Sequence, residues 1–230
     1  PVTFFLTKEN YFKKISQASL RMAGEQKLKE EDVLMMEQEG ANRMDLLFFS
    51  NQQNVYKLKA SDVADAKASA LGDYLPNLLQ LDAGETIIYM TATADYSGQM
   101  VFFFANGKAA RVEMKSYQTA SNRRKLTGAY SDKSPLVCIR RIDEECELAV
   151  YSNEPRCLIF HTALLAPKTT RTTQGVAVMN LKPRYHLEEV KTLGETSIVN
   201  QGRYRVRAVP AAGALVREED SGEEQMNLLD

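Results

Sequence analysis

The chain repeats one pattern of hydrophobic and polar positions along most of its length. An apolar run rich in β-branched and aromatic residues is followed by a short polar turn with Asn or Gly, and then by a second run that carries Lys or Arg. Such runs favour strands, and Asn and Gly adopt the positive φ angles of tight turns, so each copy predicts a β-hairpin. The five copies are residues 4–14, 47–59, 101–112, 148–160 and, most weakly, 197–207.

The spacing of the copies predicts how the hairpins are organised. Their turns lie about 45–55 residues apart, which is the spacing of blades in a propeller-like array. A turn followed by one further strand recurs between the hairpins, most clearly at 81–90 and again at 28–36 and 131–139. Each blade is therefore expected to contain about four strands, and the sequence predicts an all-β fold of five blades over residues 1–207.

Three segments depart from this pattern. Residues 25–38 are rich in Glu, Lys, Leu and Met, which favours a helix by propensity, but their place in the repeat favours a strand, and we adopt the strand. Residues 60–74 contain five alanines and predict either a short helix or a long outer loop. Residues 208–230 have little apolar content and end in an acidic run, so we expect a flexible tail there.

The charge is unevenly distributed along the chain. The sequence has 29 Lys and Arg against 30 Asp and Glu, and a net charge of −1 does not by itself indicate a nucleic-acid-binding protein. Six of the acids and no base lie in residues 218–230, so residues 1–217 carry 29 − 24 = +5. We therefore expect a mildly basic body and an acidic tail.

The residues that usually carry chemistry form no recognisable site. Cys138, Cys146 and Cys157 contain no CxxC pair, and His161 and His186 have no partners at metal-ligand spacing, so we expect neither a zinc site nor disulfides. We predict no catalytic residue, cofactor or metal in this chain. No apolar run approaches the roughly 18 residues of a membrane helix, and the start lacks a signal peptide, so we expect a soluble, cytoplasmic protein with no membrane contact. Its opening on Pro1 within an apolar run suggests a piece of a longer protein.

The hairpin at 46–59, followed by the segment 77–85, closely resembles the C-terminal domain of the A subunit of bacterial type IIA topoisomerases, DNA gyrase and topoisomerase IV. Residues 106–111 and 171–176 match further blades of that family. The resemblance implies a five-bladed β-pinwheel whose basic rim binds and bends double-stranded DNA without base specificity. It also implies that the domain presents the DNA to the catalytic core of its own A subunit, which works with an ATPase B subunit, and that it is associated with the nucleoid.

One family motif is missing. In gyrase the first blade carries a box reading Q-R-R-G-G-K-G, on which DNA wrapping depends. The matching residues 20–27 keep Arg21, Gly24 and Lys27 but lack the paired arginines. The chain therefore resembles topoisomerase IV, or a diverged paralogue, more than gyrase.

Candidate DNA contacts are the basic residues that the repeat brings to corresponding places, because phosphate charge dominates non-specific DNA binding. Outward strand positions are often Lys or Arg in any protein, but the repetition favours a function. The densest basic loop is 121–128, where Asn and Thr donors stand beside three adjacent cations. The predicted DNA-binding residues are Asn122, Arg123, Arg124, Lys125, Lys13, Lys14, Arg21, Lys27, Lys57, Lys59, Lys108, Arg111, Lys168 and Arg171.

Two other functions remain open at this point. A propeller-like protein-interaction scaffold that has lost DNA binding fits the nearly neutral net charge. A carbohydrate-active propeller enzyme would need paired carboxylates and exposed tryptophans, and the chain has no Trp.

Overall fold

The computed structural model describes residues 1–121 and 123–222. The chain forms two compact units. The first consists of Pro1–Tyr96 and Tyr117–Ala129, and the second of Ser97–Ser116 and Tyr130–Asp230. The chain thus leaves the first unit, returns to it for a short segment, and leaves it again.

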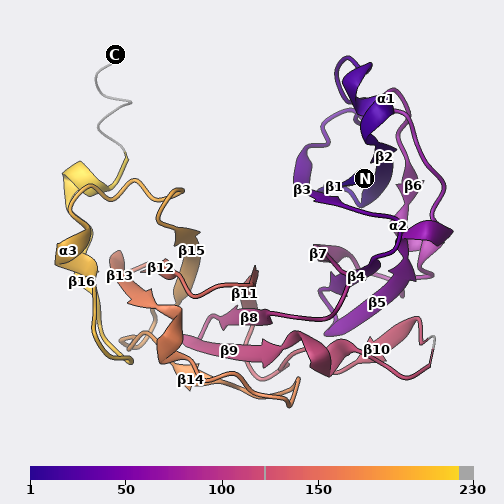
Figure 1. Cartoon of the computed structure of the whole chain (residues 1–230). Coiled ribbons are helices and arrows are strands. Elements are labelled where there is room, and N and C mark those ends of the chain that lie inside the picture. The colour runs from indigo at the N-terminus through magenta and orange to yellow at the C-terminus, as the bar shows by residue number, and fades with distance from the viewer. Residues whose placement is uncertain (122, 223–230) are drawn as a thin grey trace. The chain divides into compact units, whose positions relative to one another are not determined.

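Each unit contains two four-stranded antiparallel sheets, and each sheet is built around one of the predicted hairpins (Figure 1). The first sheet has the order β3-β1-β2-β6, with strands β1 (Val2–Thr7), β2 (Tyr11–Ser16), β3 (Leu34–Gly40) and β6 (Asp73–Tyr74). The second has the order β10-β5-β4-β7, with β4 (Asp45–Ser50), β5 (Asn54–Lys59), β7 (Ile87–Thr93) and β10 (Lys125–Thr127).

The second unit repeats this arrangement. Its first sheet has the order β11-β8-β9-β14, with β8 (Gln99–Phe104), β9 (Lys108–Glu113), β11 (Leu136–Ile142) and β14 (Val176–Ala177). Its other sheet has the order β15-β12-β13-β16, with β12 (Glu147–Ser152), β13 (Arg156–His161), β15 (Leu187–Thr192) and β16 (Ala214–Leu215).

The outer strand of each sheet comes from a distant part of the chain. Strand β6 completes the first sheet only after the second hairpin has formed, and β10 completes the second sheet only after the third hairpin. Helical segments are short: α1 (Gln17–Arg21), α2 (Leu75–Leu78), α3 (Gln201–Tyr204) and the 3₁₀ turns Ala60–Asp62, Met114–Tyr117, Thr162–Leu164 and Glu218–Asp220. No helix among the described residues is long and apolar enough to cross a membrane.

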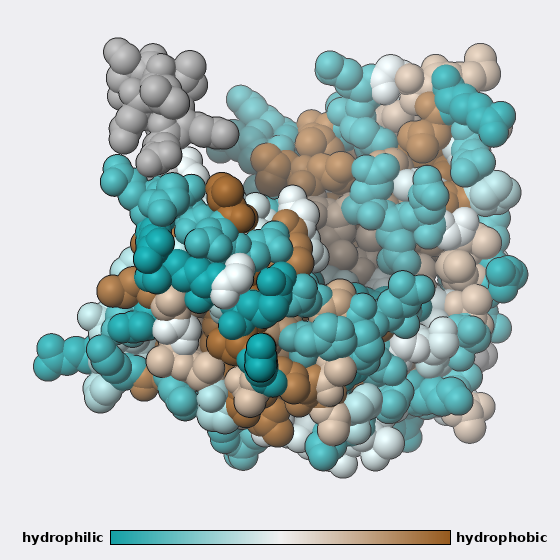
Figure 2. Space-filling view, turned by 60° about the vertical axis from the view of Figure 1, so that its left-hand side comes forward, coloured by the Kyte–Doolittle hydropathy of each residue, from teal (hydrophilic) through white to brown (hydrophobic). Residues whose placement is uncertain are grey.

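The apolar runs of the hairpins form the cores. In the first unit Phe4, Phe12 and Phe48 are completely buried, and the rings of Phe12 and Phe48 meet edge to face with centroids 5.2 Å apart. Burying one such side chain contributes about 1.5–3 kcal/mol. Hydrophilic side chains predominate on the face shown in Figure 2.

The described residues form four sheets, so the predicted number of five blades is wrong. Residues 197–207 do not form a hairpin but a loop and the short helix α3. Tyr204 of α3 packs into a core with Ala149 and Ile159, and its hydroxyl donates to the carboxylate of Asp220 at 2.7 Å. The segment therefore covers the last sheet instead of starting another one.

The structure also shows what the three segments that depart from the repeat form. In the segment 25–38, residues 25–33 form neither helix nor strand, and the strand predicted from the repeat is confirmed from Leu34 on, where β3 begins. Residues 60–74 are mostly loop, with one 3₁₀ turn and strand β6. Residues 208–222 are ordered, in contrast to the flexible tail that the sequence predicted. Strand β16 pairs with β13, and the fully buried carboxylate of Asp220 accepts hydrogen bonds from the amides of Val199 and Asn200. Residues 223–230 lie outside the described residues.

Candidate nucleic-acid interface

A basic residue recurs at one position in the second strand of three hairpins. The strand registers pair Lys14 with Phe4, Lys57 with Leu47 and Arg111 with Val101, which is the third pair of each hairpin. Ile159 occupies this position in the last hairpin. The recurrence of Lys or Arg that the sequence shows is therefore also a recurrence in space. The contacts of these side chains explain it by packing inside the fold and not by an exposed rim.

Lys14 and its neighbour Lys13 point into the first unit. Lys14 is 3% exposed, and its ammonium donates to the carbonyl of Ala60 at 2.9 Å and pairs with Asp65 at 3.2 Å. Lys13 is 1% exposed and donates to the carbonyls of Lys27, Ala68 and Ala70 at 3.0–3.3 Å. Burial lowers the pKa of Lys13. All three donors of its ammonium are used inside the protein.

Arg111 has the same role in the second unit. Its side chain is 5% exposed and donates to the carbonyls of Thr162 and Leu165 at 2.9 and 3.1 Å, and it forms an ion pair with Glu145 at 2.5 Å. Hydrogen bonds from Arg111 and Thr162 lower the pKa of the Glu145 carboxyl. This guanidinium, like the two lysines, therefore holds segments together.

These contacts correct three of the predicted DNA-binding residues. Lys13, Lys14 and Arg111 were expected on an exposed rim, because charged side chains on a strand usually point outward. The chain that follows the next hairpin returns across these strands and brings backbone carbonyls that need donors. A buried carbonyl without a partner is costly, so the cations are used inside the protein and are not available to phosphate.

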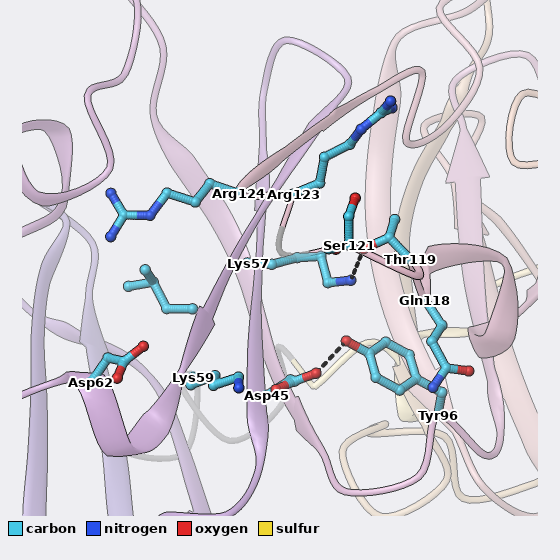
Figure 3. Close-up of a pocket in the computed structure, with 11 residues that line it drawn as sticks. Asp45, Lys57, Lys59, Asp62, Tyr96, Gln118, Thr119, Ser121, Arg123 and Arg124 are labelled. Atoms are coloured by element: carbon cyan, nitrogen blue, oxygen red, sulfur yellow. Dashed lines mark hydrogen bonds between the residues drawn. The ribbon is translucent and has the colours of Figure 1, made fainter.

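The basic loop of 121–125 is arranged differently. Its residues Ser121, Arg123 and Arg124 line a pocket of about 340 Å³ in the first unit together with residues of β5 and the open end of the β4–β5 hairpin (Figure 3). Four of the predicted cations line it: Lys57, Lys59, Arg123 and Arg124. Asp45 and Asp62 also line the pocket, and the Asp45 carboxylate accepts a hydrogen bond from the Tyr96 hydroxyl at 2.7 Å. Burial, followed by this hydrogen bond, raises the pKa of Tyr96.

Three of these cations have no side-chain partner among the described residues. The side chains of Lys59, Arg123 and Arg124 are exposed and make no hydrogen bond or ion pair with any residue that the structure describes. The two arginines extend in opposite directions from the chain (Figure 3). An exposed guanidinium without an internal partner keeps all five N–H donors available to an external anion.

Lys125 lies next to a smaller pocket of about 200 Å³, which Tyr56, Gln80 and Arg124 also line. Its ammonium lies 5.7 Å from the centroid of the Tyr56 ring and 3.6 Å from the carboxylate of Asp82. The Lys125 side chain is 40% exposed, so this ion pair contributes little to stability. The charge remains close to the surface and beside Arg124.

A comparison of the four outer strands shows what is unusual about this loop. The residue before the outer strand is Gly72, Gly175 or Gly213 in three sheets, each with a positive φ and each so close to the neighbouring strand that a Cβ would lie 2.0–2.7 Å from a backbone oxygen. In the second sheet, Lys125 has the same register position as these glycines, since Leu126 pairs with Val55 as Val176 pairs with Ala109. Lys125 itself belongs to β10 and pairs with Tyr56. The preceding residues are Arg123 and Arg124 here, and Ala70-Leu71, Thr173-Gln174 and Ala211-Ala212 in the other sheets.

The other predicted DNA contacts are not brought to this pocket. Arg21 at the end of α1 and Lys27 are exposed beside the first sheet. Lys108, Lys168 and Arg171 belong to the second unit, where Arg171 donates to the carbonyl of Ser116 at 2.9 Å. Asn122 lies outside the described residues.

The sequence reasoning did not identify several polar residues of the pocket. Gln118, Thr119 and Ser121 line it, and the hydroxyl of Thr119 accepts a hydrogen bond from Lys57 at 3.0 Å. Tyr96 comes from a different part of the chain. Only the position of Thr119 and Ser121 next to the basic run could have indicated them, whereas nothing in the local pattern points to Tyr96. Among the described residues, no three His, Cys, Asp or Glu side chains gather as metal ligands would.

Comparisons with known proteins agree on the fold. No family model matches the sequence. The chain is 23% identical over 186 residues to the A subunit of DNA topoisomerase 4 from Staphylococcus aureus, covering 79% of this chain but only 23% of the length of that relative.

Three solved structures are similar to this chain. The C-terminal domain of a DNA topoisomerase IV has a TM-score of 0.79 at 21% identity, covering 94% of this chain and 72% of that one. The C-terminal domain of E. coli ParC has a TM-score of 0.69 at 14% identity, covering 94% of both chains. The C-terminal domain of DNA gyrase A has a TM-score of 0.58 at 17% identity, covering 95% of this chain and 79% of that one. As the resemblance predicted, the chain is similar in sequence to the A subunit of topoisomerase IV and has the all-β pinwheel fold of the C-terminal domains of topoisomerase IV and gyrase A.

Proposed function

We propose that this chain is a non-catalytic domain that binds double-stranded DNA without base specificity, and that it does so at the outer edge of the second sheet. The observation that carries the proposal is the loop before β10. Where the other three sheets have a glycine packed closely against the neighbouring strand, this sheet has Lys125, preceded by Arg123 and Arg124, and the two arginines have no partner among the described residues. The second sheet thus replaces a recurring packing position of the other sheets with a run of exposed cations, and this favours a negatively charged ligand at this edge.

The chemistry of the loop fits phosphate oxygens. Arginine presents a planar fork of donors that matches a phosphate, and the hydroxyl of Ser121 stands beside it at the pocket. Contacts of this kind position a protein on the DNA backbone and carry no sequence information. We therefore expect similar affinity for different sequences and a strong dependence on salt.

The similarity to topoisomerase A subunits sets the wider proposal. We infer that the domain bends DNA and presents it to the catalytic core of its own A subunit, which works with an ATPase B subunit, in the bacterial cytoplasm at the nucleoid. The candidate contacts outside the loop, namely Arg21, Lys27, Lys59, Lys108, Lys168 and Arg171, stay predictions of further phosphate contacts along such a path.

The test compares two pairs of charge removals. Each phosphate contact contributes about −0.9 to the slope of log K against log salt, so R123A/R124A should flatten the slope by about 2 and weaken all DNA sequences alike. The matched control is K8A/K67A, which removes the same charge from exposed positions of the same unit. Fluorescence anisotropy with a labelled duplex between 50 and 200 mM salt gives both slopes.

Two outcomes would contradict the proposal. Equal slopes for the two double variants would place the interface elsewhere. If the unmodified protein binds no duplex even at 50 mM salt, a protein-interaction scaffold becomes the better interpretation.

A further inference from the structure

Lys57 was predicted to contact DNA, but its surroundings give it another role. Its ammonium donates to the carbonyl of Tyr117 and to the hydroxyl of Thr119, both at 3.0 Å. Its backbone amide donates to the carbonyl of Arg124 at 2.7 Å. One residue of β5 therefore holds both ends of the segment 117–124.

The environment of the ammonium restrains it further. The side chain is half-buried, and its Nζ lies 5.2 Å from the centroid of the Tyr96 ring. Burial lowers the pKa of Lys57, and the nearby Asp45 carboxylate partly opposes this effect. In Figure 3 the side chain points toward Thr119 and Ser121. Two of its three donors are used, so little of its hydrogen-bonding capacity remains for phosphate.

Lys14 and Arg111 show that this position has a general role in the fold. Each lies at the corresponding place in its hairpin, and each donates to carbonyls of the segment that returns after the next hairpin. In the second sheet that returning segment is the one that carries Arg123 and Arg124. An anchor that contributes to stability in two of the other sheets therefore also holds the basic loop in this one.

We propose that Lys57 is a positioning residue that holds the 117–124 segment so that Arg123 and Arg124 project to the DNA, and that it does not itself contact phosphate. This inference rests on the proposed function. Without the contacts of the Lys57 side chain, the segment could still reach phosphates. It would then lose conformational freedom on binding, which would lower the affinity.

The two roles predict different salt dependences. If Lys57 positions the loop, K57M should weaken DNA binding about tenfold, because both arginines must then be immobilised on binding. The slope of log K against log salt should stay unchanged, since the same contacts form. If Lys57 touches phosphate, the slope should flatten by about 0.9. K59M is the matched control, because it removes the same charge two residues along the strand, and it should flatten the slope by about that amount.

A double-mutant cycle separates the roles a second time. In the R123A/R124A background the anchored side chains are gone, so K57M should have no further effect on affinity. A further loss accompanied by a flatter slope would show that Lys57 contacts the DNA directly and would overturn the inference. K57R keeps a charged donor, as Arg111 does at the corresponding position, and should retain most of the affinity.

Proteolysis tests the anchor without DNA. Trypsin cleaves after arginine, so freeing the segment should raise the rate of cleavage after Arg123 and Arg124 at least fivefold in K57M, but not in K59M or K57R. Mass spectrometry of the first fragments identifies the site, and circular dichroism confirms that each variant is folded. Equal cleavage rates in folded K57M and K59M would overturn the positioning role. Failure of the proposed function would instead appear as absent DNA binding in the unmodified protein.

Discussion

Glu85 provides a quantitative test of how the second sheet is held together. Its carboxylate is 3% exposed and accepts hydrogen bonds from Ser50 at 2.5 Å, Asn54 at 2.9 Å and Tyr56 at 2.7 Å. It also accepts from the backbone amide of Asp82 at 3.0 Å. The carboxylate thus ties the 82–85 turn to the hairpin on which the basic loop rests.

The pKa of Glu85 gives the size of the effect. Burial alone would raise the pKa, but the hydrogen bonds from Ser50, Tyr56, Asn54 and the Asp82 amide lower it from 4.5 to about 2. At about 1.4 kcal/mol per pKa unit, the ionised carboxylate contributes about 3 kcal/mol to folding. Because the pKa is lower in the folded state, this stability is fully present above pH 4.5 and is lost as the pH falls toward 2.

The perturbation is E85Q, which keeps the shape of the side chain and removes its charge. We expect the variant to be less stable by about 3 kcal/mol at pH 7, and the difference should shrink to about 1.5 kcal/mol at pH 3, because the unmodified protein then loses part of the contribution. Urea unfolding between pH 7 and pH 3 measures both values. The control is E37Q, which removes an exposed carboxylate from β3. A difference that stays constant between pH 3 and pH 7 would refute the reasoning.

Two further predictions concern the outer strands and the missing gyrase box. Gly175 and Gly84 both have a φ of +76°, but a Cβ would lie 2.0 Å from the Ala109 carbonyl oxygen at Gly175 and would meet nothing within 4 Å at Gly84. Urea unfolding should therefore show a loss of about 1 kcal/mol for G84A and at least about 3 kcal/mol for G175A, and equal losses would contradict the close approach. An A subunit that carries this domain, combined with its B subunit, should decatenate or relax DNA but not introduce negative supercoils, because residues 20–27 lack the paired arginines. Negative supercoils on a relaxed plasmid would show that this box is dispensable here.

The hairpins were predictable because their signal is local. Apolar runs on either side of a turn residue determine a hairpin within about a dozen positions, and the four hairpins 4–14, 47–59, 101–112 and 148–160 all form. Within 25–38 the repeat also correctly favoured a strand over the helix that propensity favoured, although the strand begins only at Leu34. The copy at 197–207 failed because a weak strand pattern there is outweighed by packing, with Tyr204 buried against the last sheet and bonded to Asp220.

The candidate site shows the limit of the same reasoning. The sequence by itself determined that a Lys or Arg recurs in the second hairpin strands and that 123–125 is the densest basic run. Only the tertiary structure decided that Lys14 and Arg111 donate hydrogen bonds to carbonyls 46 and 51 residues away along the chain. It also decided that Arg123 and Arg124 remain without partners among the described residues. The physical reason is that a cation is free for phosphate only if no buried acceptor needs it, and the strands exchanged between sheets bring those acceptors from parts of the chain that no local pattern connects.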